Sequence, residues 1–339
     1  MKLPFPDSEL FERSAQDFAK TALDVFEFQH AHNEVYRKFC DSLRRHPSTV
    51  KSVTDIPFLP VELFRTHKIY SASEEPEIVF TSSGTTGSVT SLHSVRSKRL
   101  YELSCYHGFV NAYGSPKDCI FLFLLPSYLE RGGSSLVYMS ELLRQWSIEE
   151  DTLRGNPEGV QSFFLHNYAE LAERLASLNQ YNQGKKVILL GVTYALLDLA
   201  EQFPQDISNI IVMETGGMKG KRKEITREEL HATLKKAFHV PAVHSEYGMT
   251  ELLSQAYSKG EGIFHCPPWM KILIRETSDP LSWCAQGKTG GVNIIDLANI
   301  YSCSFISTSD LGKLHDDGSF EILGRFDFSD TRGCNLLYQ

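Results

Sequence analysis

Hydrophobic residues follow two different spacings along most of the chain. Segments with apolar residues every three to four positions are predicted to be helices with one buried face; these are residues 7–45, 97–112, 134–143, 158–178, 194–202 and 227–238. Short apolar runs lie between them and are predicted to be strands, at residues 77–81, 119–125, 187–190 and 210–214. This alternation predicts an α/β fold in which helices cover both faces of a sheet.

The pattern changes after Pro268. Short apolar runs at residues 271–275, 291–296, 303–307 and 320–324 are separated by Gly, Ser, Asp and Asn. Such spacing predicts a small antiparallel β unit beside the layered α/β sheets.

Composition and charge narrow the class of protein. A chain of 339 residues is long enough for two domains or for one large unit. Its net charge of −8 disfavours nucleic acid polymers and anionic membrane surfaces as partners. Seven cysteines, an odd number with no CxxC pair, predict a reduced, cytoplasmic protein with free thiols. No apolar run approaches the ~20 residues needed to span a bilayer, and the two prolines within residues 1–6 argue against a signal peptide.

The clearest chemical motif is a run of small residues directly after the predicted strand 77–81. It consists of Ser82, Ser83, Gly84, Thr85, Thr86 and Gly87. Backbone amides of a glycine-containing loop can form an anion-binding concavity, and hydroxyl groups add donors. The run lacks the Gly-Lys-[Ser/Thr] ending of a Walker A loop. It therefore predicts a phosphate site of another type, with an ordinary surface loop as the alternative.

A second motif, residues 247–251 (YGMTE), places an aromatic ring, a glycine turn, a hydroxyl and a carboxylate close together. Tyr247 offers a face for a base, and Glu251 offers a ligand for Mg²⁺. Two weaker motifs follow, at residues 308–312 (TSDLG) and 324–327 (GRFD). An Asp in a tight turn usually bonds its own backbone, and an exposed Arg–Asp pair contributes little.

In this order the four motifs resemble those of the adenylate-forming superfamily of acyl-CoA ligases, firefly luciferase and nonribosomal adenylation domains. The resemblance implies that Thr85 and Thr86 bind ATP phosphates, that Tyr247 lies against adenine and that Glu251 binds Mg²⁺. It also implies that Asp310, with Arg325, holds the ribose hydroxyls. The implied ATP-binding set is completed by Ser82, Ser83, Gly84, Gly87, Gly216, Gly217, Gly248 and Thr250.

A narrower resemblance is to the acyl-protein synthetases of bacterial luminescence, the LuxE family. It rests on residues 56–60 (IPFLP), 125–131 (LPSYLER), 134–139 (SSLVYM), 216–220 (GGMKG) and 332–334 (RGC). The resemblance implies activation of a fatty acid by ATP and transfer of the acyl group to Cys334. An acyl-reductase or acyl-carrier protein is then the implied partner.

The residue chemistry agrees with that implication. A carboxylate is a poor electrophile until it is joined to a leaving group such as AMP, and a thiolate then attacks the mixed anhydride readily. Lys219 is a candidate to face phosphate or carboxylate, and His244 to contact the acyl carboxylate. A solvated charge run with Lys221, Arg222 and Lys223 is the alternative for Lys219, and a structural role is the alternative for His244.

Two departures from the superfamily pattern affect the expected mechanism. Gly87 is followed by Ser88, so the loop lacks the usual proline and lysine. The chain ends twelve residues after Asp327, so the mobile C-terminal domain with its catalytic lysine is expected to be absent. The predicted organisation is an adenylating domain at 1–323, with a helical segment at 1–55, and a hinge and tail at 324–339. Without that domain, an acyl group on Cys334 is favoured over release to coenzyme A.

Two other functions remain open from the sequence. One is an acyl- or aryl-CoA ligase that uses free coenzyme A. The other is a degenerate, non-catalytic scaffold subunit of an acyl-processing complex. A hydrolase is disfavoured because no Gly-x-Ser-x-Gly sequence is present.

Overall fold

Five parallel strands form one half of the main sheet. The computed structural model describes residues 4–13, 15–82, 90–126, 132–153, 162–182, 184–218, 222–223 and 225–325. The parallel strands lie in the order β5 (Phe163–Phe164), β4 (Cys119–Leu124), β6 (Lys186–Val192), β7 (Ile210–Thr215) and β8 (Val243–Tyr247). β4 and β6 are almost entirely apolar and buried, as expected for strands covered on both faces.

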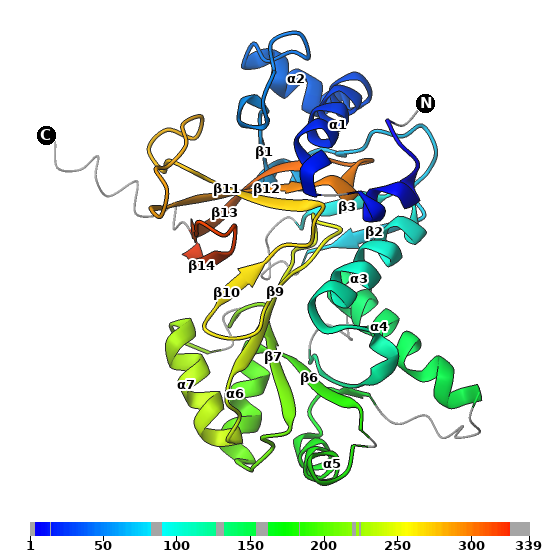
Figure 1. Ribbon diagram of the computed structural model, residues 1–339, viewed down its shortest axis with the longest axis vertical. Coiled ribbons are helices and arrows are strands. Elements are labelled where there is room, and N and C mark those ends of the chain that lie inside the picture. The colour runs from blue at the N-terminus through cyan, green and yellow to red at the C-terminus, as the bar shows by residue number, and fades with distance from the viewer. Residues whose placement is uncertain are drawn as a thin grey trace, which may run out of the picture.

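The antiparallel half continues from β8 without a break. The order is β9 (Ala256–Ser258), β10 (Ile263–His265), β14 (Phe320–Arg325), β13 (Phe305–Leu314), β12 (Thr289–Asp296) and β11 (Met270–Arg275). β1 (Leu59–Pro60) pairs with β13. The antiparallel unit predicted after Pro268 is therefore present and shares one hydrogen-bonded sheet with the parallel strands (Figure 1). A separate hairpin consists of β2 (Ile78–Thr81) and β3 (Leu92–Val95).

Helices cover both faces of the parallel half (Figure 1). Neighbouring residues of β8 point to opposite faces: His244 contacts Tyr113 of α3 (Lys98–Tyr113), and Ser245 contacts His231 of α7 (Arg227–Phe238). α3 and α7 therefore lie on opposite sides of the sheet. The remaining helices here are α4 (Ser135–Leu153), α5 (Tyr168–Gln180) and α6 (Thr193–Gln202).

Two N-terminal helices, α1 (Phe18–His32) and α2 (Glu34–Ser42), pack near the connection between β12 and β13. Buried amides make this contact: Gln29 donates to the carbonyl of Asn299 at 3.0 Å, and Asn33 donates to that of Ser302 at 2.9 Å. Short 3₁₀ segments complete the chain, at Asp7–Glu12, Ala15–Asp17, Val53–Asp55, Val61–Arg65, Pro116–Asp118 and Leu297–Asn299.

Several predicted elements need correction. The helix predicted at 158–178 begins only at Tyr168, because Phe163 and Phe164 pair with β4. The helix predicted at 7–45 is divided at Asn33, whose side chain caps α2. The motif 308–312 is not a tight turn, because it lies inside β13. The strands predicted at 119–125, 187–190 and 210–214 and the helix at 227–238 are confirmed.

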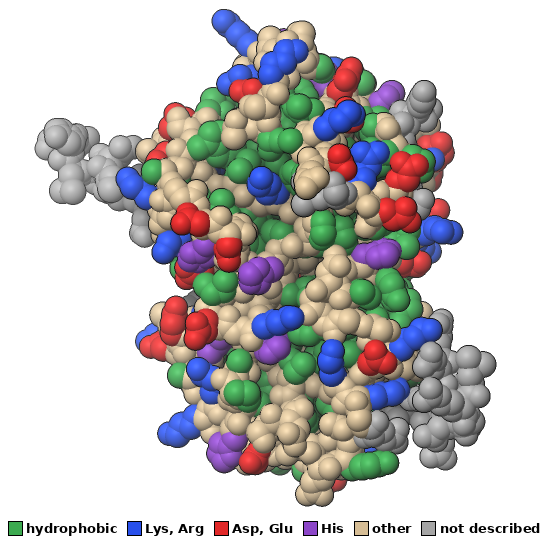
Figure 2. Space-filling view, viewed as in Figure 1, with side chains coloured by type: hydrophobic (Ala, Val, Ile, Leu, Met, Phe, Trp, Pro, Cys, Tyr) green, Lys and Arg blue, Asp and Glu red, His purple; other side chains and the backbone are tan. Residues whose placement is uncertain are grey.

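Two further features of the described residues are the distribution of charge on the surface and the hydrophobicity of the helices. On the face shown in Figure 2, acidic and basic side chains of the described residues are interspersed, without a continuous basic stripe. Among the helices of the described ranges, none is long and apolar enough to cross a membrane. The six cysteines that the structure describes are free thiols, and Cys334 lies outside the described residues.

Candidate active site

The carboxyl ends of β7 and β8 meet at one edge of the sheet. Thr215, the last residue of β7, pairs with Glu246, and Tyr247 ends β8. Gly216 and Gly217 follow β7 at this edge, and Gly216 has a φ of +71° that favours glycine. Ligands of open α/β sheets commonly bind outside such strand ends. The structure therefore brings the predicted Gly216–Gly217 and Tyr247 segments to the same place.

Tyr247 joins two other predicted residues at this edge. Its hydroxyl donates to Asp310 Oδ2 at 2.7 Å, and Arg325 Nε donates to Asp310 Oδ1 at 3.1 Å. Asp310 and Arg325 face each other across β13 and β14. Burial and the neighbouring Asp310 charge raise the pKa of Tyr247 well above its usual range, so the hydroxyl stays a donor. Three predicted ribose and adenine residues thus form one hydrogen-bonded group.

The Asp310 carboxylate retains capacity for a ligand. Each oxygen accepts one of the two bonds above, and a carboxylate oxygen offers about two acceptor positions. The Arg325 side chain is 76% exposed, so solvent and a ligand can reach it. The free acceptor positions of Asp310 are therefore compatible with a ribose diol, whose two hydroxyl groups need acceptors.

Gly248 lets the chain pass close to a buried carboxyl group. A Cβ atom at this position would lie 2.5 Å from Glu246 Oε1. Glu246 is buried and accepts a short hydrogen bond from the Thr215 hydroxyl. Burial raises its pKa to about 7, and the nearby Glu214 charge adds to the increase. The sequence motif did not single out Glu246, although its position just before Tyr247 was a usable signal.

Glu251 lies beside the base of the predicted phosphate loop. Glu251 is buried, and the neighbouring Ser91 side chain helps to stabilise its charged form. Ser91 pairs with Ser82 through bonds of 2.8 and 3.1 Å. Ser82 follows β2 and Ser91 precedes β3, and these two strands pair with each other. Of the loop's predicted phosphate ligands only Ser82 is described. The others lie outside the described residues, namely Ser83, Gly84, Thr85, Thr86 and Gly87.

The environment of Glu251 fits a divalent cation. Burial raises the pKa of its carboxyl group, and among the described residues it forms no ion pair. A carboxylate oxygen is the ligand type that Mg²⁺ prefers. A cation here would offset the cost of burying the charge.

Buried polar residues that the motifs missed hold this segment in place. His93 Nδ1 lies 2.7 Å from the Thr250 carbonyl oxygen, and Asn299 donates to the Glu251 carbonyl oxygen at 2.7 Å. Burial lowers the pKa of His93 to about 4. Asp296 accepts bonds from the amides of the residues that follow Glu251, at positions 253 and 254. Asp296 and Asn299 lie in the otherwise mostly apolar run 292–301, and this was the available sequence signal for these two residues.

Of the three predicted catalytic residues, the structure describes only His244. His244 bonds the hydroxyl of Tyr113 at 3.0 Å on the α3 face, the face that Glu246 also occupies. Burial lowers the pKa of His244 to about 4, with Lys259 contributing. Tyr247 points to the opposite face of the sheet from His244. Contact of His244 with the acyl carboxylate stays a prediction. Lys219 and Cys334 lie outside the described residues, whereas Arg222 of the same basic run pairs with Asp198 at 3.5 Å.

Sequence comparisons agree with the narrower resemblance. Residues 4–121 match the family model described as "Acyl-protein synthetase, LuxE". A long-chain-fatty-acid–luciferin-component ligase of Photorhabdus luminescens is 33% identical over 69 residues. That match covers 20% of this chain and 59% of the ligase.

Solved structures resemble the chain in fold. An open 2-hydroxyisobutyryl-CoA ligase in complex with 2-HIB-AMP and CoA has a TM-score of 0.66 and 13% identity, covering 97% of this chain and 80% of that one. ATP-bound MatB from Rhodopseudomonas palustris has a TM-score of 0.51 and 15% identity, covering 73% and 47%. The fold is that of adenylate-forming ligases, and over residues 4–121 the chain matches the acyl-protein synthetase family LuxE.

Proposed function

We propose that this protein is an ATP-dependent ligase that converts a carboxylic acid to an acyl-adenylate. The observation that carries the proposal is the hydrogen-bonded group of Tyr247, Asp310 and Arg325 at the strand ends of an adenylate-forming fold. It joins residues from three strands to which the superfamily resemblance gave roles at one nucleotide. The buried Glu251, near Ser91 at the base of the phosphate loop, adds a candidate Mg²⁺ ligand.

In the first step, a carboxylate oxygen attacks the α-phosphorus of ATP, and the bond to pyrophosphate breaks. Asp310 and Arg325 would hold the ribose, and Tyr247 would orient the base. Lys219 and the phosphate-loop amides would stabilise charge on the phosphates as it redistributes. Mg²⁺ bound at Glu251 would neutralise phosphate charge. His244 is assigned to the acyl carboxylate, and Gly216, Gly217 and Thr250 line the nucleotide site.

In the second step, the thiolate of Cys334 attacks the acyl carbonyl carbon, and the bond to AMP breaks. The products are AMP and a thioester on Cys334, from which an acceptor or reductase protein takes the acyl group. The Photorhabdus luminescens relative is a long-chain-fatty-acid–luciferin-component ligase, which supports a long-chain fatty acid as substrate. The domain division at residue 323 and a cytoplasmic location stay predictions.

Fatty-acid-dependent exchange of labelled pyrophosphate into ATP tests the adenylation step without presuming an acceptor. We expect exchange that depends on both Mg²⁺ and the acid, strongest for long chains in a series of acids. Absence of exchange with every acid, together with no ATP binding in calorimetry, would contradict the proposal and favour a scaffold subunit.

Labelled fatty acid and ATP, followed by a denaturing gel, test the acyl acceptor. We expect label on the protein that is released by hydroxylamine and missing in Cys334→Ser, while Cys284→Ser keeps it. A coenzyme A ligase is the second candidate, because the 2-hydroxyisobutyryl-CoA ligase structure holds both an acyl-adenylate and CoA. Formation of acyl-CoA with no labelled protein would establish that second candidate instead.

A further inference from the structure

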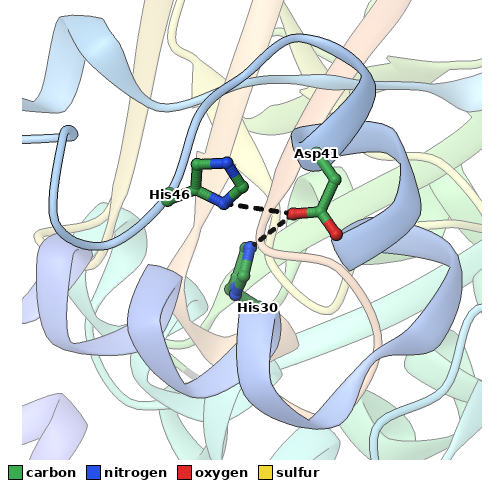
Figure 3. A group of neighbouring side chains, drawn as sticks. All are labelled: His30, Asp41 and His46. Carbon is green, nitrogen blue, oxygen red and sulfur yellow. Dashed lines mark hydrogen bonds and ion pairs between the residues drawn. The ribbon is translucent and has the colours of Figure 1, made fainter.

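Three potential metal ligands converge where α1 and α2 end (Figure 3). His30 lies in the last turn of α1, Asp41 lies in the last turn of α2, and His46 follows a few residues later. His30 Nε2 is 3.1 Å from Asp41 Oδ1, and His46 Nδ1 is 3.2 Å from the same oxygen. All three ligand atoms lie within 4.8 Å of one another. None of these residues belongs to the candidate active site.

The separations agree with the geometry of a tetrahedral zinc site. Zinc lies about 2.0–2.1 Å from imidazole nitrogen and about 2.0–2.2 Å from carboxylate oxygen, so neighbouring ligands are about 3.3 Å apart. The two measured separations, 3.1 and 3.2 Å, are close to that value. Asp41 Oδ1 therefore lies at a ligand-to-ligand distance from both imidazole nitrogens, and the two nitrogens lie within 4.8 Å of each other.

Both histidines come from backbone that is held in place. Gln29, next to His30, is buried and donates to the carbonyls of Asn299 and Ile300. The His46 amide donates to Thr49 Oγ1 at 3.0 Å, and the His46 carbonyl accepts from the Thr49 amide at 2.9 Å. The ligand positions are thus fixed before any ion binds.

The site is open on one side. The His30 side chain is 15% exposed, whereas those of Asp41 and His46 are 46% and 47% exposed. An ion can enter from solvent, and a water molecule can fill a fourth position. Two imidazoles and one carboxylate suit Zn²⁺ and its borderline neighbours, whereas Mg²⁺ and Ca²⁺ prefer oxygen ligands throughout.

We propose that His30, Asp41 and His46 bind one Zn²⁺ ion, separate from the Mg²⁺ assigned to Glu251. The ion ties the ends of α1 and α2 to the segment that follows α2. Because the site exists only in the folded chain, binding stabilises the fold in proportion to the logarithm of free zinc over its dissociation constant. This inference does not depend on the proposed ligase activity.

The test uses the untagged full chain, freed of metal with a chelator and then titrated with Zn²⁺ against a chromophoric competitor. Co²⁺ serves as a spectroscopic probe, because its visible absorption reports tetrahedral coordination. We expect one zinc ion per chain, a rise in Tm on binding, and a tetrahedral cobalt spectrum. His30→Ala, Asp41→Asn and His46→Ala should each weaken binding by about 100-fold or more.

Two variants serve as matched controls. His32→Ala removes another exposed histidine from the end of α1 and should leave binding unchanged. Cys284→Ser removes a partly exposed free thiol outside the cluster and should also leave binding unchanged. If His30→Ala does not fold, the exposed positions Asp41 and His46 carry the test. No saturable binding in the native sequence, or binding that survives His46→Ala and Asp41→Asn, would show that the cluster is only hydrogen-bonded.

Discussion

The hydroxyl of Tyr247 donates a 2.7 Å hydrogen bond to the carboxylate of Asp310, 63 residues further along the chain. The bond crosses from the last residue of β8 to the middle of β13. It links the two halves of the sheet at the edge where the nucleotide is proposed to bind. Because the Asp310 carboxylate is proposed to hold the ribose, we expect loss of its charge to affect ligand binding more than folding.

Asp310→Asn is expected to weaken ATP binding by about 10- to 100-fold. The substitution keeps the side-chain volume but replaces charge-assisted bonds, each worth about 1.5–3 kcal/mol, with neutral ones. Isothermal titration with ATP and Mg²⁺ measures the change, and urea unfolding confirms that the variant is folded. Asp317→Asn, in the turn of the same β13–β14 hairpin, is the control and should bind ATP normally. Equal affinities for the native protein and Asp310→Asn would remove Asp310 from the site.

Asp296→Asn is expected to destabilise the fold by about 2–3 kcal/mol. Asp296 is buried, and its oxygens accept four bonds, from the amides of Leu253, Ser254 and Ala298 and from the Ser254 hydroxyl. An amide nitrogen in place of either oxygen would face donors and leave them unsatisfied. Urea unfolding measures the free-energy difference. Asp279→Asn removes an exposed turn carboxylate and should have no measurable effect; an equally small effect for Asp296→Asn would contradict this account of the segment after Glu251.

His244 should make stability fall as the medium becomes acidic. Burial lowers its pKa from 6.5 to about 4, so between these values the unfolded chain binds a proton that the folded chain does not. The stabilisation is complete above pH 6.5 and is lost as the pH falls towards 4. At 1.36 kcal/mol per pKa unit the loss is at most about 3 kcal/mol, and solvent screening of the partly exposed ring reduces it. His244→Gln should show a smaller decrease in the free energy of unfolding over this range, whereas the exposed His67→Gln should follow the native protein.

Glu246 should make stability fall as the pH rises, which is the opposite of the effect of His244. Burial raises its pKa from 4.5 to about 7, so the folded chain holds a proton that the unfolded chain has lost. Its contribution is complete below pH 4.5 and is lost as the pH rises through 7, by about 3 kcal/mol. Glu246→Gln keeps an acceptor for Thr215 and cannot ionise. It should therefore be more stable than the native protein above pH 7, as measured by urea unfolding at several pH values. A variant that loses stability with rising pH as the native protein does would exclude Glu246 as the titrating group.

Much of the parallel half was predictable from local pattern. The apolar runs at 119–125 and 187–190 allow little but a buried strand, and the capping box of Thr226 and Glu229 defines where α7 begins. Prediction failed where a long-range contact outweighed the local preference. Phe163 and Phe164 form a strand only because β4 provides a partner. Asp310 lies in a strand because β12 and β14 flank it.

The candidate site divides in the same way. The available chemistry could be predicted from the sequence, because the motifs around Ser82, Tyr247, Asp310 and Arg325 contain the donors and acceptors that a nucleotide needs. The folded chain was needed to show that Tyr247 and Asp310 share a hydrogen bond, that Glu251 lies near Ser91, and that His30 and His46 converge on Asp41. Local preferences act over a few residues of backbone, whereas these contacts depend on which strands and helices become neighbours. That choice depends on burying the apolar faces of the whole chain together.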